Sequence, residues 1–351
     1  MLKKLKIVLH VLNSNSFSGA EKVVIDIIKN LNDNSIKCIY VSRKGDIENR
    51  LIKEHVPYIL LDTMNTRSIK EVINQIHPDL VHCHDFRASM MVALSGTKVP
   101  LISHIHQNPS WIKKVNVKTL LYLMTLNRYN CVISVSKSFF DEYIFSNQVK
   151  NKIVLSNIID LKKIQLNRKV VKERVYDIVY VGRLSQEKNP MRVLKIVLKL
   201  KRNFPNIRCA IVGNGNLYQE CEKFIKDYEL GENVQLVGFL DDISDVLNKA
   251  KIGINTSLWE GFGLSVVEYL AFGLPVVCSS VGGLVDLVND SCGKLCFNDD
   301  DFIDEITLLL SDLDYYSKKS LSAINRASDL NNVDEYVNKV KKIYFELIGG
   351  E

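Results

Sequence analysis

The sequence predicts an α/β protein built from two doubly wound parallel sheets, and three observations support this prediction. The chain has 351 residues, a length that suggests two domains. Its composition, 46% hydrophobic and 25% charged, is that of a globular protein. Short apolar runs alternate with helical patterns along the chain, which is typical of a parallel sheet covered by helices.

In the first half, the predicted strands are short apolar runs. The first, at residues 5–11, is continuous, as expected for a buried parallel strand, and it leads through a loop into an apolar helical pattern at 23–28. Further strands are predicted at 38–41, 58–61, 80–82, 101–104 and 132–135, with helical patterns at 68–76 and 89–94. We assign residues 1–168 to an N-terminal domain.

The chain becomes polar and charged between residues 157 and 174, which marks the best boundary between domains. A second α/β series follows, with strands predicted at 178–181, 209–212, 234–237, 251–255 and 276–278. We assign residues 169–334 to a C-terminal domain. Residues 335–351 are predicted to form a C-terminal helix that packs back on the N-terminal domain.

The net charge of +6 is unevenly distributed. Residues 1–168 carry 24 Lys and Arg against 13 Asp and Glu, a balance of +11, whereas residues 169–351 carry 22 against 27, a balance of −5. A basic first domain indicates an acidic partner surface, or only a solubilising charge pattern. Residues 111–129 combine apolar bulk with a purely cationic edge, the pattern of a helix lying on anionic lipid. A core helix with solvated lysines is the alternative.

Composition also bears on location. No apolar run reaches the ~18 residues that span a bilayer, and the N-terminus has too short an apolar run for a secretion signal. The eight cysteines are scattered without a Cys-x-x-Cys motif, which argues against a zinc site or disulfide framework and fits a reducing compartment. We expect a cytoplasmic protein that is peripheral on the inner face of the cell membrane.

Histidines gather at the ends of two predicted strands, as His82 with His84 and as His104 with His106. The carboxyl ends of strands are the functional edge of a parallel sheet. We take alternate strand residues to point to opposite faces, so that neither pair chelates one ion, and we expect no metal site. Most of these histidines are interpreted as core residues satisfied by hydrogen bonds, with one of them lining a ligand cleft.

Residues 255–277 carry the strongest functional pattern. An apolar run ends there, a turn with Gly261 and Gly263 follows, and apolar residues then recur at helical spacing. Such a turn lets the backbone approach a ligand, and the helix start offers N–H groups to a phosphate. Glu260 precedes the turn and Glu268 lies within the helix, so both can face a pocket at the strand end.

Other features of the second half could hold a diphosphate without a metal. Arg183 offers a bidentate fork and Lys188 a point charge, both in the loop after a predicted strand. A glycine loop at 213–215 follows the next strand. The chain lacks Gly-x-x-x-x-Gly-Lys-Ser/Thr, which disfavours a P-loop NTPase. It also lacks a clean Gly-x-Gly-x-x-Gly after the first strand, which weakens a nicotinamide dehydrogenase.

Together these residues resemble the retaining glycosyltransferases of family 4, or group 1, of the bacterial polysaccharide-biosynthesis type. In the second half, the resemblance rests on Gly182, Arg183, Leu184, Lys188, Asn189, Gly213, Gly215 and the stretch from Glu260 to Glu268. In the first half, it rests on residues 18–21, 104–106 and 132–136, with Ser18 where many relatives have a glycine. The resemblance implies a GT-B fold, in which two Rossmann-like doubly wound domains face each other across a cleft.

The resemblance also implies roles for individual residues. Arg183 and Lys188 would clamp the diphosphate and stabilise the charge that grows on the leaving nucleotide. Glu260 would contact hydroxyls of the donor sugar, and Glu268 would bind the ribose. His106 would line the cleft near the sugar, with His104 as the competing candidate. Further donor contacts are expected from Gly19, Gly213, Gly215, Phe239, Gly261, Phe262, Gly263 and Leu264.

The implied function is retaining transfer of a sugar from a nucleotide-diphosphate sugar, with UDP favoured, to a hydroxyl of a glycan or lipid-linked glycan in cell-surface polysaccharide synthesis. No cofactor and no metal are expected. The alternatives are another GT-B sugar-nucleotide enzyme, such as an epimerase, and a non-catalytic GT-B binding protein. Nucleic-acid binding is not expected, because aromatic and basic residues are not interleaved.

Overall fold

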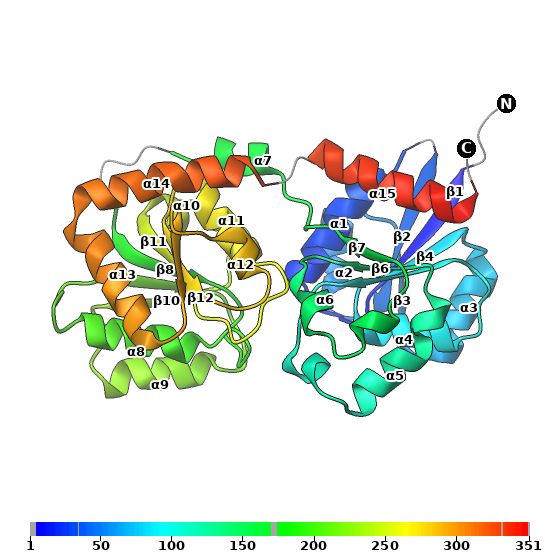
Figure 1. Ribbon diagram of the computed structural model, residues 1–351, viewed down its shortest axis with the longest axis horizontal. Coiled ribbons are helices and arrows are strands. Elements are labelled where there is room, and N and C mark those ends of the chain that lie inside the picture. The colour runs from blue at the N-terminus through cyan, green and yellow to red at the C-terminus, as the bar shows by residue number, and fades with distance from the viewer. Residues whose placement is uncertain (1–4, 34, 170–173, 331–332, 350–351) are drawn as a thin grey trace. The chain divides into compact units, whose positions relative to one another are not determined.

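The computed structural model describes residues 5–33, 35–169, 174–330 and 333–349 as two compact units (Figure 1). The first unit combines residues 1–159 with residues 331–351, and the second comprises residues 160–330. Residues 170–173 of the predicted boundary stretch lie outside the described residues.

The first unit contains a parallel sheet of seven strands. They are Lys6–Val11 (β1), Ile36–Arg43 (β2), Tyr58–Leu61 (β3), Leu80–Cys83 (β4), Leu101–Ile105 (β5), Cys131–Ser134 (β6) and Lys152–Val154 (β7). Their order in the sheet is β3-β2-β1-β4-β5-β6-β7. The order therefore reverses between β1 and β4, and doubly wound sheets bind ligands at such a switch point, outside the carboxyl ends of the strands.

Helices cover both faces of this sheet (Figure 1). Gly19–Leu31 (α1) and Val333–Ile348 (α15) pack together on one face, and α15 contacts β4. The other face carries Thr66–Ile76 (α3), Phe86–Leu94 (α4) and Val117–Thr125 (α5) around a large apolar core. The remaining helical segments are Ile47–Lys53 (α2), Ser110–Lys113 (η1), Leu126–Arg128 (η2), Ser138–Glu142 (α6) and Ser146–Gln148 (η3).

The second unit repeats this topology with six parallel strands. They are Tyr176–Val181 (β8), Cys209–Val212 (β9), Val234–Gly238 (β10), Ala250–Asn255 (β11), Val276–Ser279 (β12) and Gly293–Cys296 (β13). Their order is β10-β9-β8-β11-β12-β13, so the switch point of this unit lies between β8 and β11.

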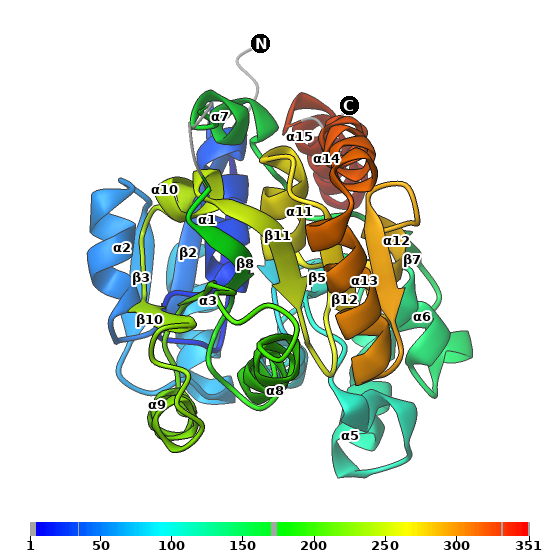
Figure 2. The ribbon, with the colours of Figure 1, turned by 90° about the vertical axis from the view of Figure 1, so that its left-hand side faces the viewer.

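Helices again form two layers (Figure 2). One layer consists of Pro190–Leu200 (α8), Tyr218–Asp227 (α9) and Asp299–Ser311 (α13), and its core is apolar. The other layer contains Leu264–Ala271 (α11) packed on Leu313–Ser328 (α14), with Leu161–Leu166 (α7), Ser244–Asn248 (α10) and Leu284–Leu287 (α12) as short additions. Central strands such as β9 and β12 are buried along their whole length, because both of their faces are covered.

Local sequence sets several helix starts. Pro190 occupies the first turn of α8, where its missing N–H is not needed. Asn298 forms a capping box with Asp301 at the start of α13, whose first turn is acidic and so complements the helix dipole.

The predicted α/β class with two doubly wound parallel sheets is confirmed. The prediction of one helix over residues 111–129 is wrong, because the segment breaks into η1, α5 and η2. The break falls at Asn116, whose side chain accepts hydrogen bonds from the N–H groups of Lys118 and Thr119 and thereby starts a new helix. The edge strands β7 and β13 were not predicted.

Candidate active site

The candidate site of the second unit lies at its switch point, where the loops after β8 and β11 meet. Arg183 and Lys188 lie in the first loop, and Glu260 lies in the second. The N–H of Leu258 donates to the carbonyl oxygen of Glu187 at 2.8 Å, so the two loops are in direct contact. The structure thus brings together residues that lie more than 70 positions apart in the sequence.

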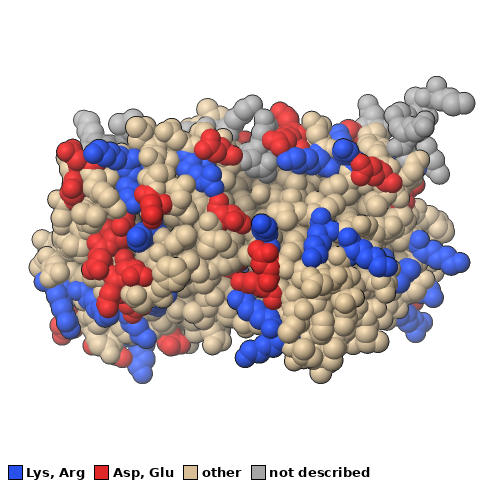
Figure 3. Space-filling view, viewed as in Figure 1, with Lys and Arg blue, Asp and Glu red and all other residues tan. Residues whose placement is uncertain are grey.

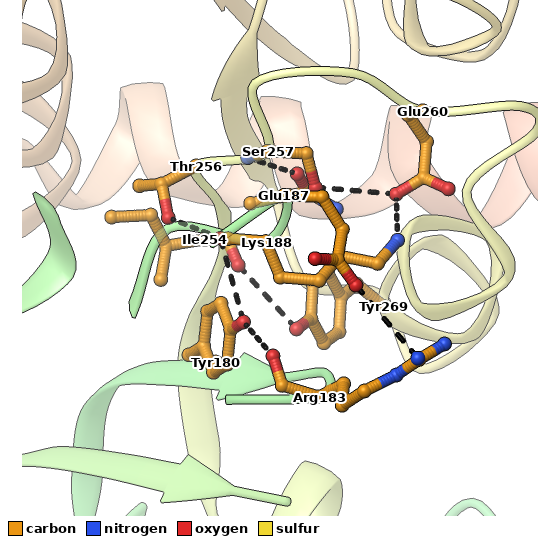
Figure 4. Close-up of polar contacts among 10 residues, drawn as sticks. Tyr180, Arg183, Glu187, Lys188, Ile254, Thr256, Ser257, Glu260 and Tyr269 are labelled. Atoms are coloured by element: carbon orange, nitrogen blue, oxygen red, sulfur yellow. Dashed lines mark hydrogen bonds and ion pairs between the residues drawn. The ribbon is translucent and has the colours of Figure 1, made fainter. Parts of the chain in front are cut away.

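A half-buried ion pair forms the centre of this site (Figure 4). Lys188 Nζ donates to Glu260 Oε2 at 2.5 Å, and Ser257 Oγ donates to the same oxygen at 3.2 Å. The side chains of Lys188 and Glu260 are only 25% and 11% exposed. Because water is largely excluded, each charge depends on the other for compensation. The pair offers a cation to a phosphate and a carboxylate to sugar hydroxyls.

Arg183 is held more loosely than Lys188. Its side chain is 48% exposed, and its Nη1 lies 3.9 Å from Glu187 Oε1. An exposed pair at this distance contributes little to stability, so the guanidinium can turn toward an incoming anion without a large loss. A planar fork at a strand end suits bidentate binding of a phosphate.

Buried hydroxyl groups that the sequence analysis did not select hold the loop after β8 in place. Thr256 Oγ1 donates to the carbonyl oxygens of Lys188 at 3.2 Å and Asn189 at 2.9 Å. Tyr180 Oη donates to the carbonyl oxygen of Arg183 at 3.1 Å. The contacts of Thr256 with Lys188 and of Tyr180 with Arg183 are drawn in Figure 4. They fix the backbone from which the two cations extend.

Tyr269 performs a similar task from α11. Its ring is fully buried, and its hydroxyl oxygen accepts a hydrogen bond from the N–H of Val181 at 2.6 Å. Burial raises the pKa of Tyr269 and of Tyr180, so both hydroxyls stay neutral. Both tyrosines interrupt apolar patterns in the sequence. That interruption was the available signal, since a polar atom at a core position needs a partner.

Two glycines allow loops to pack against the site. Gly213 has φ 139°, and a Cβ there would lie 1.9 Å from the carbonyl oxygen of Gly182. Gly282 has φ 53°, and a Cβ there would lie 1.8 Å from the carbonyl oxygen of Glu260. Only glycine fits either position, because φ is positive and backbone fills the space of a side chain. Gly215 likewise packs against the backbone of Leu184.

The remaining predicted donor contacts surround the start of α11. Gly263 precedes the helix with φ 104°, and no side chain caps the helix there. Its first N–H groups are therefore not capped by a side chain and can bind an anion. Gly261 and the Phe262 side chain are buried, Leu264 and Glu268 are half-buried, and Phe239 is an exposed aromatic side chain.

At the switch point of the first unit, the polar side chains are histidines, whereas the second unit has a Lys–Glu ion pair there. His82, His84, His104 and His106 are all buried, and His10 on β1 joins them. The ring centroids of His82 and His84 lie 4.1 Å apart, as do those of His104 and His106. The prediction that each pair spans opposite faces is therefore wrong, because it is successive strand residues that alternate and residues two apart share a face.

This correction also removes the geometric argument against a metal site. Two triads that share His84 each bring three imidazole nitrogens within 4.8 Å of one another. Burial lowers the pKa of all five histidines, to about 3 for His10 and about 4 for His106. The five rings are thus neutral at pH 7.

Acidic groups flank the histidines at the same sheet edge. Gly19 is the exposed first residue of α1, and Ser18 does not cap that helix. The Ser18 hydroxyl donates instead to Oε2 of the buried Glu21 at 2.5 Å. Asp85 accepts from the N–H of Asn13 at 2.7 Å, and burial raises the pKa of Asp85.

Apolar side chains project from α5 and from the residues before it. We call this the α5 surface, and its side chains are between 43% and 74% exposed: Val115, Val117, Leu120, Leu121 and Met124. Residues 86–140 contain seven Lys and Arg and no Asp or Glu. On the face shown in Figure 3, the area over α5 is largely free of charged side chains. None of the described helices is long and apolar enough to cross a membrane.

Two family models match consecutive parts of the chain. The model of the group 1 glycosyl transferases matches residues 162–327, and that of glycosyltransferase family 4 matches residues 17–163. The chain belongs to the group 1 and family 4 glycosyltransferases. The switch-point edge of the second unit lies within the matched residues, whereas in the first unit β1, which carries His10, precedes them.

This glycosyltransferase is similar to named bacterial enzymes. It is 24% identical over 317 residues, 83% of this chain and 81% of the relative, to the Escherichia coli UDP-Gal:alpha-D-GlcNAc-diphosphoundecaprenol alpha-1,3-galactosyltransferase. It is 28% identical over 265 residues, 74% of this chain and 70% of the relative, to a Campylobacter jejuni alpha-1,4-N-acetyl-D-galactosaminyltransferase named for a PP-undecaprenol-linked glycan.

Its fold is that of solved glycosyltransferase structures. Anabaena HepE in complex with UDP and glucose superposes with a TM-score of 0.83 at 20% identity, over 96% of this chain and 98% of HepE. The predicted GT-B fold class is confirmed by such neighbours.

Proposed function

We propose that this glycosyltransferase moves a sugar, with retention of anomeric configuration, from a UDP-sugar to a hydroxyl of a lipid-linked glycan in cell-surface polysaccharide synthesis. The Lys188–Glu260 pair carries the proposal, because it places a half-buried cation and a carboxylate beside a helix start that no side chain caps, at a switch point. The names of the two enzyme relatives support the acceptor class, and the HepE complex with UDP supports the donor.

The proposed chemistry assigns a task to each group. Arg183 and Lys188 bind the diphosphate, and the start of α11 donates N–H groups to it. As the bond between sugar and diphosphate breaks, negative charge grows on the phosphate oxygens, and these donors stabilise it. Glu260 accepts hydrogen bonds from sugar hydroxyls while positive charge develops at the reacting carbon. A phosphate oxygen then takes the proton of the acceptor hydroxyl, which attacks the same face of the sugar.

Other predicted residues hold the donor without touching the reacting bond. Glu268 accepts hydrogen bonds from the ribose hydroxyls, while Gly19 and Phe239 extend the donor contacts. For the first unit, we propose that it binds the acceptor and that His106 is one of its substrate-binding residues.

A donor and acceptor screen tests the proposal. The protein is incubated with UDP-, GDP- or ADP-sugars and with a polyprenyl-diphosphate-linked sugar, and the product is analysed by mass spectrometry and anomeric NMR. We expect transfer from an α-linked UDP-sugar to give an α-linked product. An inverted product, or transfer only from GDP- or ADP-sugars, contradicts the proposal. A changed nucleotide sugar without acceptor identifies an epimerase, and stabilisation by UDP without turnover identifies a binding protein.

We further propose that the α5 surface places this enzyme on an anionic membrane. Apolar side chains project beside Lys118, whose Nζ lies 5.7 Å from the centre of the Trp111 ring, and Lys114 is also exposed. Apolar groups that enter the acyl boundary and lysines that meet anionic headgroups are the two attractions that hold interfacial helices.

Vesicle sedimentation tests the membrane proposal. We expect binding to anionic vesicles at low salt and little binding to zwitterionic ones. Met124→Ser should weaken binding about ten-fold, since burying such a side chain contributes about 1.5 kcal/mol. Leu321→Ser is the control, because Leu321 is 62% exposed on α14 of the second unit and should leave binding unchanged. A protein that stays in solution with anionic vesicles would refute the proposal.

A further inference from the structure

The buried histidines of the first unit and Tyr344 of α15 form one unbranched series of hydrogen bonds, which we call the histidine chain. Its links run from His106 Nε2 to His84 Nδ1 (3.0 Å), His84 Nε2 to His10 Nδ1 (2.9 Å), His10 Nε2 to Tyr344 Oη (3.4 Å), Tyr344 Oη to His82 Nδ1 (2.6 Å) and His82 Nε2 to His104 Nδ1 (3.1 Å). Its two ends are His106 Nδ1 and His104 Nε2.

The number of N–H and O–H hydrogens available to these six groups couples their tautomeric states. Burial lowers the pKa of each imidazole and raises that of Tyr344, so every member is neutral at pH 7 and carries one hydrogen on nitrogen or oxygen. Six groups supply six such hydrogens, and the five links use five of them. The sixth hydrogen must lie at one of the two ends.

The position of the sixth hydrogen sets every tautomer. With that hydrogen on His106 Nδ1, each link is satisfied only if all five imidazoles are Nδ1–H. With it on His104 Nε2, all five are Nε2–H. Tyr344 fits both states, because its hydroxyl can accept from His82 and donate to His10, or do the reverse. The five rings therefore change tautomer together.

The two ends differ in their surroundings. His104 is fully buried, and its Nε2 has no hydrogen-bond partner among the described residues. A hydrogen there would be a buried donor without an acceptor, which is rarer in proteins than an unsatisfied acceptor. His106 Nδ1 is likewise buried without a hydrogen-bond partner among the described residues. His106 is, however, 8% exposed at the sheet edge, and the neighbouring Asn157 side chain favours a hydrogen on this ring, since it raises the pKa of His106 although burial lowers that pKa more. The sixth hydrogen is therefore more stable at His106.

We propose that the histidine chain locks His106 in the Nδ1–H tautomer, so that this residue presents a hydrogen-bond donor of fixed direction at the carboxyl edge of the first sheet. Tyr344, His10, His82 and His84 are then positioning residues that act through His106. Its role toward substrate rests on the proposed function, in which the N–H donates to an oxygen of the bound substrate. The other tautomer would present a lone pair there and repel that oxygen.

NMR of the histidine-labelled protein at neutral pH tests the tautomer directly. We expect all five rings of the chain to be Nδ1–H, whereas the exposed His55 and His77 populate both tautomers and serve as internal references. Nε2–H signals, or mixed tautomers within the chain, overturn the proposal. Metal analysis of the same sample gives a second check. One transition-metal ion per protein, bound by these rings, would replace the linking hydrogens and also overturn it.

A pair of variants on α15 tests the role of the chain in catalysis. Tyr344→Phe removes the middle links, while Tyr336→Phe removes a buried hydroxyl that has no partner among the described residues. We expect Tyr344→Phe to give mixed tautomers at His106 and to lower kcat about ten-fold with little change in KM, as when outer partners of oriented histidines are removed. Tyr336→Phe should change neither. Equal kinetics in the two variants contradict the positioning role.

The tautomer measurement on the wild-type protein needs no substrate and no variant. Nδ1–H rings in a protein that transfers no sugar would therefore refute the proposed function and leave the tautomer assignment supported. If Tyr344→Phe fails to fold, the wild-type spectrum still decides the proposal.

Discussion

The two units share one sheet topology, yet their switch points carry different kinds of polar group. The second unit has an ion pair between Lys188 and Glu260, with the charges mostly shielded from water. The first unit has buried neutral imidazoles, and no histidine occurs in residues 160–330 of the second. The topology supplies an edge where strands end, whereas the residues just beyond the strands decide whether that edge offers charge or fixed N–H dipoles.

Low pH should produce the largest difference between the two units, because it should destabilise the first unit far more than the second. The unfolded chain binds protons at its histidines below about pH 6.5, whereas burial lowers the pKa of His10 to about 3 and of His106 to about 4. The stability of the first unit is thus intact above pH 6.5 and falls as the pH drops toward 4. At about pH 5 the loss is about 2 kcal/mol for each buried histidine. Protonation of Asp85, whose pKa burial raises, offsets a part of it.

One tryptophan in each unit allows this prediction to be measured. Trp259→Phe leaves Trp111 as a reporter of the first unit, and Trp111→Phe leaves Trp259 as a reporter of the second. We expect the urea midpoint reported by Trp111 to fall sharply between neutral pH and about pH 5, with a much smaller shift for Trp259. Equal shifts of both reporters would show that the buried histidines do not govern acid stability.

Removing the charge of Lys188 from the second unit should give the next largest effect, which is a loss of turnover. Lys188→Ala deletes a donor to the leaving phosphate and leaves the half-buried carboxylate of Glu260 without its cation. We expect kcat to fall by about 10²–10³, the range for loss of one such donor. Lys251→Ala is the control, since Lys251 forms a 2.8 Å ion pair with Asp177 on the strands and not in the site loops. Wild-type turnover by the first variant, or equal losses in both, would remove Lys188 from the mechanism.

Adding a single methyl group at Gly282 should also displace the loop that carries Glu260. In Gly282→Ala the new Cβ would lie 1.8 Å from the carbonyl oxygen of Glu260, at a residue with φ 53°. We expect a loss of about 1–3 kcal/mol in stability from overpacking and a parallel loss of activity as Glu260 shifts. Gly231→Ala is the matched change, because a Cβ there meets nothing within 4 Å. Thermal unfolding and kcat of the two variants should differ, and identical values would show that the loop adapts.

Much of the fold could be predicted from the sequence, because central strands buried on both faces read as apolar runs bounded by loops. The edge strand β7 could not, since its three residues are exposed or half-buried and lack that pattern. The charged part of the second site was predictable for a related reason. Arg183, Lys188 and Glu260 lie in loops that follow strands, and the carboxyl ends of parallel strands share one edge.

The supporting contacts were not predictable, because their partners are distant in the sequence. Thr256 binds backbone carbonyl oxygens of residues 188 and 189, and no side-chain pattern marks a carbonyl. Tyr344 binds His82 across 262 positions from a separate helix. Periodicity identifies that helix as amphipathic, yet it does not reveal which strand lies beneath the tyrosine.

The smallest predicted effect compares one buried hydroxyl in each unit. Thr256 Oγ1 donates to the carbonyl oxygens of Lys188 and Asn189, and Thr125 Oγ1 donates to that of Tyr122 at 2.8 Å. Replacing either threonine by valine keeps the shape and removes the donor, so each variant should lose about 1–2 kcal/mol of stability. Only Thr256→Val should also raise the KM for the donor, because only that hydroxyl holds the backbone from which Lys188 extends. If Thr125→Val raises KM equally, the loop contact is not what positions Lys188. In that case the difference between the two edges lies in their charges alone.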